Sequence, residues 1–361
     1  MYISSLSLMN FRNYENQKIR FSPYTNLIYG DNAQGKTNIL EALYLFSQGR
    51  SHRTKLDREL IKFGADSARL KLKFHDSDRD YTALMQMVRN GRKTININHI
   101  PITKLSMLMN YLNIVMFSPE DLNLIKGSPS ARRQFIDSAI SQLYPAYLIS
   151  LTEYHKALVQ KSSLLKSIKR GADKTMLSVW NEQLAKNCAR IMNERHAFIN
   201  ELCTFAKVIQ KEISNEDFDV HYVPSIRVDK VDADTIFNFL ELHSRREIEF
   251  KSALYGIQRD DINVFINNNN ARIYGSQGQQ RSATLSLKIA QAEYIHSVKG
   301  EYPVLLLDDI MSELDINRRT YLAEKIKNKQ VFITSTDTDL VKSTDQTKLF
   351  YVKQGQVYEG E

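Results

Sequence analysis

The chain has 361 residues, of which 42% are hydrophobic and 25% are charged, and its formal net charge is +8. This composition is typical of a soluble globular protein with two or three domain-sized units, and the basic balance favours polyanionic partners. No apolar run approaches the roughly 20 residues of a membrane helix, and two cysteines, Cys188 and Cys203, are too few for a disulfide framework. The N-terminal residues lack the pattern of a secretory leader. We therefore expect a cytoplasmic protein without a membrane partner.

The most specific motif lies between an apolar run at residues 27–29, which predicts a buried strand, and an amphipathic segment at residues 37–46, which predicts a helix. It follows the pattern G-x-x-x-x-G-K-[ST], in which backbone N–H groups surround a phosphate at a helix N-terminus. Lys36 is expected to contact the β- and γ-phosphates of ATP, and the Thr37 hydroxyl to hold Mg²⁺. A glycine-bearing turn without a ligand is the alternative interpretation. The expected nucleotide-binding residues are Gly30, Asp31, Asn32, Ala33, Gln34, Gly35, Lys36, Thr37 and Asn38.

Extended segments follow the first helix. Residues 68–74 alternate apolar and basic side chains, and two further strands are predicted at residues 81–88 and 94–97. The pair Asn90-Gly91 between them is a strong hairpin signal. Together these segments predict an antiparallel sheet beside the nucleotide-binding strand.

Helical periodicity dominates from residue 127 to about residue 250. Apolar residues keep a three-four spacing over residues 151–168 and 177–209, which predicts two antiparallel helices with a break at residues 170–174. The first helix would be roughly 30 Å long, too short for a coiled-coil rod. Such a spacing indicates the face along which the two helices pack, and it predicts no catalytic or binding role for these residues. Residues 220–241 follow no clear pattern.

The basic charge is distributed unevenly. Residues 126–211 contain fourteen Lys and Arg against six Asp and Glu, and a second basic cluster lies at residues 50–58. Both clusters are candidates for contact with the phosphates of a nucleic acid. Each is also consistent with a solvated surface, and Arg132 and Arg133 are equally consistent with buried ion pairs that stabilise the fold.

A second nucleotide-related pattern follows further along the chain. Residues 304–307 are apolar and run directly into Asp308 and Asp309, which predicts a buried parallel strand with Asp308 at its carboxyl end. A P-loop ATPase needs a carboxylate there to hold Mg²⁺, and Asp309 is placed to polarise the attacking water. Solubilising acids at a strand end are the alternative. Further strands are predicted at residues 112–117 and 330–336, the latter ending in hydroxyl side chains suited to sensing a γ-phosphate.

Glycine and hydroxyl residues precede a helix predicted from Ala283 to about His296. Ser276, Gly278 and Gln279 are therefore candidates for a second anion-binding helix N-terminus. The alternative is that Ser276 or Ser282 is only an N-cap.

The order of these motifs resembles the ABC-type ATPase heads of the SMC and RecF group. Three segments are similar to the RecF family of bacterial DNA recombination and repair proteins: residues 6–14, with the pattern L-x-L-x-x-F-R-N-Y, residues 117–137, and residues 305–315. The resemblance spans nearly the whole chain.

This resemblance implies an α/β fold: an ABC-type P-loop ATPase head with an antiparallel β subdomain, formed by residues 1–125 and 251–361, and an inserted helical-hairpin arm or lid at residues 126–250. It implies ATP and Mg²⁺ as cofactors, an ATP-dependent homodimer, and binding to double-stranded and gapped DNA. With RecO and RecR, such a protein promotes recombinase loading and the SOS response. In the dimer, Ser276, Gly278 and Gln279 of one subunit would contact ATP on the P-loop of the other.

The chain also departs from related patterns. Transporter ATPases place Glu at the position of Asp309 and a His near residues 334–336, so Lys36, Asp308 and Asp309 are expected to support slow, DNA-dependent hydrolysis used as a switch. Residues 255–261 lack the Pro and His of the family pattern G-P-H-R-D-D and are assigned no catalytic role. No Q-loop glutamine is identified. The alternative function, an ATPase subunit that energises a membrane transporter, offers no reason for a basic helical arm.

Overall fold

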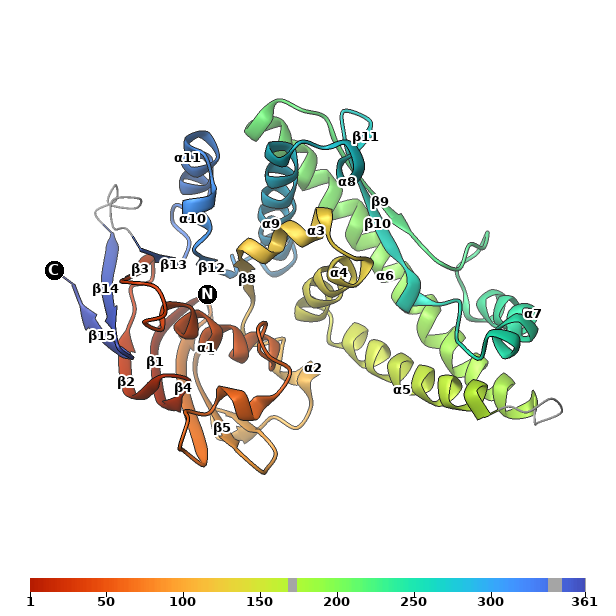
Figure 1. Ribbon diagram of the computed structural model, residues 1–361, viewed down its shortest axis with the longest axis horizontal. Helices are drawn as coiled ribbons and strands as arrows, with labels where there is room; N and C mark the ends of the chain where they lie inside the picture. Colours follow the sequence, from red (N-terminus) through yellow and green to blue (C-terminus); the bar gives the residue numbers. More distant parts are fainter. Residues whose placement is uncertain (168–173, 337–345, 361) are drawn as a thin grey trace. The chain divides into compact units, whose positions relative to one another are not determined.

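The computed structural model describes residues 1–167, 174–336 and 346–360, and the chain divides into two compact units. The first unit contains Met1–Asp121 and Lys288–Glu361, and the second contains Leu122–Leu287 (Figure 1). The sequence-based division at residue 125 lies close to the first of these boundaries. Residues 251–287, which are expected from the sequence to belong to the head, are grouped with the second unit.

One sheet of the first unit contains the strands next to the predicted nucleotide-binding motifs. Its strand order is β15-β14-β3-β13-β12-β8. All neighbouring strands in it are parallel except β14 and β15. Strands β12 and β13 are buried along their whole length, as their apolar sequences require. The predicted strands are confirmed as β3 (Thr25–Tyr29), β8 (Ile114–Phe117), β12 (Val304–Asp308) and β13 (Val331–Ser335); β14 (Thr347–Lys353) and β15 (Gln356–Glu359) complete the sheet.

The predicted antiparallel sheet is also present in the first unit. Its order is β2-β1-β4-β5-β6-β7, with β1 (Tyr2–Phe11), β2 (Tyr14–Arg20), β4 (Ser67–His75), β5 (Asp80–Val88), β6 (Thr94–Ile97) and β7 (Ile100–Pro101). Alternate residues such as Leu70 and Leu72 are buried, while their neighbours on the strand are exposed. The buried face packs in one core with α1 (Lys36–Gln48) and the parallel sheet.

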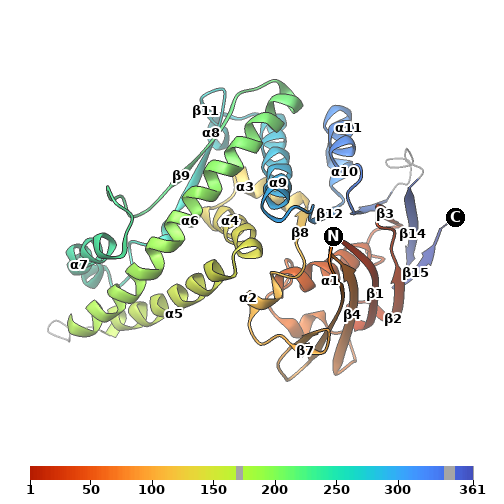
Figure 2. The same cartoon turned by 180° about the vertical axis from the view of Figure 1, so that it is seen from behind.

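Helices make up most of the second unit, and α5 and α6 lie side by side in both views (Figure 1 and Figure 2). The two predicted helices are confirmed, although α6 is longer than expected; part of the predicted break, residues 170–173, lies outside the described residues. The second of them has 41 residues and spans about 60 Å. The helices are α3 (Asn123–Lys126), α4 (Pro129–Leu143), α5 (Pro145–Ser167), α6 (Lys174–Ser214), α7 (Ala233–Phe250) and α8 (Ala271–Tyr274), followed by α9 (Gln277–Lys299), in which the boundary between the units falls.

The unassigned segment at residues 220–241 begins within a small sheet. Strand β9 (Phe218–Val223) pairs antiparallel with β10 (Asp261–Ile266), which also pairs with β11 (Asn269–Asn270). Helix α7 then begins after Asp232, whose side chain accepts a hydrogen bond from the backbone N of Thr235 at 2.8 Å. Since the partner of β9 lies about 40 residues later, local pattern does not reveal this strand.

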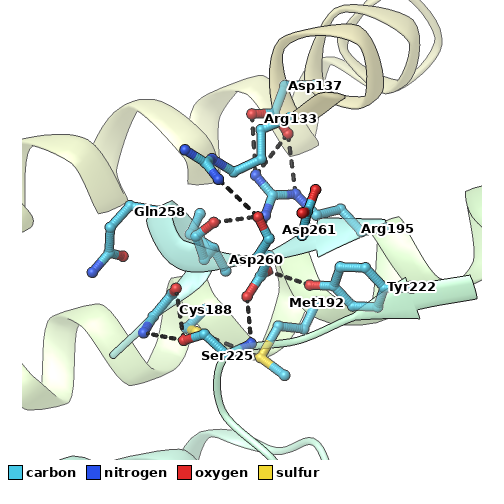
Figure 3. A network of polar contacts seen from close by, with 12 residues as sticks. Arg133, Asp137, Cys188, Met192, Arg195, Tyr222, Ser225, Gln258, Asp260 and Asp261 are labelled. Atoms are coloured by element: carbon cyan, nitrogen blue, oxygen red, sulfur yellow. Dashed lines mark hydrogen bonds and ion pairs between the residues drawn. The ribbon is translucent and has the colours of Figure 1, made fainter. Parts of the chain in front are cut away.

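A buried polar network joins α4, α6, β9 and the loop at residues 255–261 (Figure 3). Arg195 donates to Asp137 and Asp260, each at 2.8 Å, and Asp260 also accepts hydrogen bonds from Tyr222 and from the backbone N of Ser225. Arg195 and Asp260 are each 1% exposed, so their charges must be paired. Burial raises the pKa of the Asp260 carboxyl, and the charge of Arg195 opposes that rise. The loop without an assigned catalytic role therefore has a structural one.

This loop also depends on Gly256, which has φ of +124°, and a Cβ placed there would lie 2.0 Å from the Tyr154 hydroxyl. Tyr154 is 1% exposed and has little room to move. We predict that Gly256→Ala lowers the free energy of unfolding by about 3 kcal/mol, from backbone strain and overpacking together. Urea unfolding followed by circular dichroism measures the loss.

Gly64 provides the matched control. Its φ is +85°, but no heavy atom lies within 4 Å of a Cβ at that position. Gly64→Ala should therefore cost only about 1 kcal/mol of backbone strain. Tyr154→Phe in the Gly256→Ala background should restore part of the loss. Equal losses at the two glycines would show that Tyr154 does not restrict residue 256.

Candidate functional site

The loop between β3 and α1 has the backbone conformation of an anion-binding nest. Gly30, Ala33 and Gly35 have φ of 143°, 62° and 119°. A Cβ at residue 30 would lie 2.4 Å from the carbonyl O of Val352, so the backbone there is too close for a larger side chain. Successive N–H groups in such a loop point toward one concavity at the start of α1.

Lys36 is held over this loop. Its Nζ donates hydrogen bonds to the carbonyl O of Gly30 at 2.5 Å and of Asp31 at 2.8 Å, and the residue is 8% exposed. Burial lowers the pKa of Lys36, and the charges of Asp309, Asp31 and Asp308 oppose that change. An anion arriving at the loop would therefore stabilise the ammonium form.

Hydroxyl and carboxylate groups meet where α1 begins and strands β12 and β13 end. Thr37 Oγ1 donates to Asp308 Oδ1 at 2.9 Å, and Thr334 Oγ1 donates to the same oxygen at 2.7 Å. Asp308 is 9% exposed. The sequence predicts Thr334 only as part of a strand ending in hydroxyls, and the structure shows that it contacts the carboxylate directly. These are oxygen donors of the type that Mg²⁺ prefers.

Asp309 follows Asp308 in a left-handed conformation, with φ of 53°. Its backbone N donates to Thr334 Oγ1 at 2.9 Å, and its side chain accepts from Ser312 Oγ at 3.2 Å. The side chain is exposed. The turn thus separates the two neighbouring carboxylates, so that one is buried beside Thr37 and the other faces solvent.

Two hairpin turns support the loop, and the motif alone does not predict them. From the turn between β1 and β2, Asn13 Nδ2 donates to the carbonyl O of Gln34 at 2.7 Å, and from the first residue of β2, Tyr14 Oη donates to the carbonyl O of Gly35 at 3.0 Å. From the turn between β14 and β15, the backbone N of Gln354 donates to Gln34 Oε1 at 2.7 Å. The pattern F-R-N-Y at residues 11–14 was the available signal for the first turn.

Arg12, which lies in the turn between β1 and β2, forms a bidentate ion pair with Glu41 of α1. Nε and Nη2 of Arg12 lie 2.8 and 2.7 Å from the two carboxylate oxygens, and the Glu41 side chain is fully buried. Burial alone would raise the pKa of Glu41, but hydrogen bonds from Arg12 and Ser51 lower it below its ordinary value. The pair fixes the first hairpin to the helix that carries Lys36 and Thr37.

Ser276 and Gln279 form a reciprocal capping box at the start of α9. The backbone N of Gln279 donates to Ser276 Oγ at 3.2 Å, and the backbone N of Ser276 donates to Gln279 Oε1 at 2.8 Å. The helix begins at Gln277, so its predicted start at Ala283 is wrong, and Ser282 lies inside it and is not its N-cap. Gly278 lies in the first turn, and Gln279 Nε2 also donates to Glu216 at 2.7 Å.

Several basic residues of the 126–211 segment are buried and paired. Arg132 lies 2.6 Å from Asp261, and Lys161 lies 2.5 Å from Glu247 with both side chains fully buried. Arg195 belongs to the network described above. The interpretation of Arg132 as part of a buried ion pair is therefore confirmed, and Arg133 donates to the carbonyl O of Asp260 at 2.8 Å. The surface of the second unit is less basic than the sequence count indicates.

A loop with the conformation of an anion-binding nest, followed by a helix and faced by a carboxylate at a neighbouring strand end, defines a P-loop nucleotide-binding domain. The family model described as RecF/RecN/SMC N terminal domain matches residues 2–359. The chain is 41% identical over 362 residues to the DNA replication and repair protein RecF of Clostridium perfringens strain SM101, covering 99% of both chains. It is 40% identical over 369 residues to RecF of Staphylococcus carnosus strain TM300, covering 99% of this chain and all of the relative. The chain belongs to the RecF family of DNA replication and repair proteins.

Solved structures agree with this assignment. The chain is similar to the recombination mediator protein RecF-ATPrS in the RecFOR pathway, with a TM-score of 0.94, 36% identity, and coverage of 100% of this chain and 98% of the other. The corresponding RecF-ATP structure gives a TM-score of 0.92 at 35% identity. An Smc head bound to the C-winged helix domain of ScpA, with a TM-score of 0.60 at 17% identity, shares the fold alone. The predicted ABC-type ATPase head fold is confirmed, and a transporter subunit is not favoured.

The ion pair of Arg12 and Glu41 generates a stability prediction. Arg12→Ala leaves a fully buried carboxylate without its cation, so we expect the free energy of unfolding to fall by about 3 kcal/mol. Glu41→Gln in the same background should restore most of the loss, since it removes the unpaired charge. Chemical denaturation of the single and double variants measures both effects.

Arg53 is the control for this prediction because it also contacts α1 but is exposed. Its side chain donates a hydrogen bond to Asn38 of α1 at 3.0 Å. Arg53→Ala should cost at most about 0.5 kcal/mol. If Arg12→Ala and Arg53→Ala lose the same stability, the buried pair does not hold the hairpin to α1.

Proposed function

We propose that this chain binds ATP with Mg²⁺ at the loop formed by residues 30–38 and uses the nucleotide as a slow switch in DNA repair. The observation that carries the proposal is the contact between Thr37 Oγ1 and Asp308 Oδ1 at 2.9 Å, which joins the P-loop to a buried carboxylate. The similar RecF-ATP structure supports ATP as the nucleotide.

The residues present fit such a cofactor. The left-handed glycines leave a concavity at a helix N-terminus for phosphates, and the Thr37 hydroxyl and Asp308 carboxylate are oxygen donors for Mg²⁺. Bound Mg²⁺ would neutralise charge on the phosphates. Lys36 supplies a second cation, and Thr334 fixes the orientation of Asp308 through the hydrogen bond at 2.7 Å.

Asp309 is the candidate for orienting the attacking water. Its carboxylate is exposed and turned away from the buried Asp308 by the left-handed backbone, and Ser312 hydrogen-bonds one of its oxygens. Asp has a shorter reach than the Glu that transporter ATPases use at this position, which supports slow hydrolysis. DNA is the expected stimulus for hydrolysis.

The first prediction of this proposal concerns Lys36. Lys36→Ala removes the cation aimed at the β- and γ-phosphates, and we expect ATP affinity to fall by about a hundredfold or more. Titration calorimetry with Mg²⁺ and ATP measures the change. Lys55→Ala, which removes an exposed lysine outside the loop, should leave the affinity unchanged. Equal affinity in the two variants would remove Lys36 from the site.

We further propose that ATP drives a homodimer in which Ser276, Gly278 and Gln279 of one subunit contact the γ-phosphate held by the other. The capping box supports this role because it fixes a polar helix start, with the positive end of the α9 dipole, in an exposed position. Since ADP lacks the γ-phosphate, only ATP would bind the dimer better than the monomer.

Ser276→Asp tests this arrangement without removing the cap. Asp is as good an N-cap as Ser, so the stability of α9 should be kept, but its charge would repel a γ-phosphate. We expect ATP binding by each subunit to persist while ATP-dependent dimerisation, measured by analytical ultracentrifugation, is lost. Ser276→Asn caps equally well without charge and should still dimerise. Normal dimerisation of Ser276→Asp would place Ser276 outside the composite site.

The partners complete the proposal. The name DNA replication and repair protein and the RecFOR pathway of the similar structures support double-stranded and gapped DNA as ligands and RecO and RecR as partners. On this basis we assign recombinase loading and the SOS response to the chain, and place it in the cytoplasm with the chromosome. Among the described residues, no helix is long and apolar enough to span a membrane.

A further inference from the structure

The outward face of the antiparallel sheet carries basic residues in register. Arg69, Lys71 and Lys73 alternate with the buried residues of β4, and Lys18 and Arg20 do the same on β2. Strand β1 lies between them: Ser5 pairs with Arg20 and Lys73, and Ser7 pairs with Lys18 and Lys71. We call this surface the cationic sheet face; it consists of Ser5, Ser7, Lys18, Arg20, Arg69, Lys71 and Lys73.

No residue that the structure describes neutralises the charges of this face. All five basic residues are exposed, and their side chains form no ion pair or hydrogen bond within the described ranges. On β5, the residues that pair with Lys73, Lys71 and Arg69 are Thr82, Leu84 and Gln86, so no carboxylate faces them. Two carboxylates at the margins of the face are paired with other residues: Asp80 with His75, and Glu359 with Lys348.

This arrangement contrasts with the basic segment of the second unit. There, Arg132, Lys161 and Arg195 are buried in ion pairs, and Lys207 and Lys211 lie 3.2 and 3.3 Å from acidic partners. Repulsion among five unpaired cations on one sheet is unfavourable unless an anion covers them. The cationic sheet face therefore differs from the second unit in bringing five unpaired basic residues of the described chain together in register.

The spacing of these cations fits a nucleic acid backbone. Alternate residues of a strand lie about 7 Å apart, which is comparable with the through-space separation of neighbouring phosphates on one DNA strand. The rows on β2 and β4 flank β1 and are about 10 Å apart, within the range of DNA groove widths, about 6 to 12 Å. The hydroxyls of Ser5 and Ser7 between the rows are donors of the kind that bind phosphate oxygens.

We propose that the cationic sheet face is the surface on which this protein binds the phosphate backbone of duplex DNA. The proposal rests on the DNA-binding function proposed above and names its surface. Lysine, arginine and serine contacts to phosphates carry no base sequence, so binding at this face is sequence-independent.

The test is a triple variant, Arg69→Gln, Lys71→Gln and Lys73→Gln, in the full-length protein. Each phosphate contact contributes about 0.9 to the slope of log K against log salt. Fluorescence anisotropy with a labelled 30-base-pair duplex, in the presence of ATP, should show that slope reduced by about 2 to 3. The dissociation constant at about 0.1 M salt should rise about tenfold or more. Two duplexes of unrelated sequence should give the same change.

A matched control removes the same charge from the helical arm. Lys156, Lys186 and Arg190 are exposed on α5 and α6, and their replacement by Gln should change the slope by less than about 1. A second variant, Lys18→Gln with Arg20→Gln, tests the face from a different strand and should reduce the slope by about 1 to 2. Thermal unfolding checks that each variant is folded.

The assignment of this face would be overturned if the sheet variants kept the wild-type slope of log K against log salt. It would also be overturned if only the arm variant reduced that slope. Failure of the wild-type protein to bind duplex in a salt-dependent way would instead overturn the DNA-binding function on which it rests. An acidic protein partner that binds the face while DNA affinity is unchanged would also contradict the proposal.

Discussion

The rest of the site depends on one contact between residues that are 271 positions apart, the hydrogen bond from Thr37 Oγ1 to Asp308 Oδ1. Parallel pairing makes it possible: Asp308 is opposite Thr334, and Thr334 is opposite Ile28, so the carboxyl ends of β3, β12 and β13 meet at one edge. A shift of one residue in β12 would turn Asp308 to the other face of the sheet. Strand register is thus the constraint that brings together the oxygen donors proposed to hold Mg²⁺.

The structure uses charge in two different ways. Buried pairs such as Arg12 with Glu41 and Lys161 with Glu247 fix elements to one another, and removing either partner leaves a costly unpaired charge. The cations of the cationic sheet face have no such partners in the described chain and are available for an external polyanion. Sequence composition does not separate these two uses, because a paired and an unpaired lysine or arginine count equally as basic residues.

The elements that can be predicted from the sequence are those marked by residues within or next to them. Apolar runs beside the P-loop and before Asp308 predicted the strands that hold them, and alternation at residues 68–74 predicted β4. Long-range contacts were not accessible: Asn13 and Gln354 approach Gln34 only after the sheets form. The start of α9 differs from the prediction for another reason. Ser276 and Gln279 have the spacing of a capping box, but Gly275 and Gly278 are poor helix formers and obscure that signal.

The most direct test of the account is Mn²⁺ binding, measured by electron paramagnetic resonance in the presence of ATP, because Mn²⁺ substitutes for Mg²⁺ at oxygen ligands. The wild-type protein should hold one nucleotide-dependent Mn²⁺ per chain. Asp308→Asn, which keeps the size of the side chain but removes its charge, should still bind ATP and lose most of the affinity for the metal. Equal Mn²⁺ affinity in the two proteins would contradict the claim that the start of α1 and the end of β12 together form the metal site.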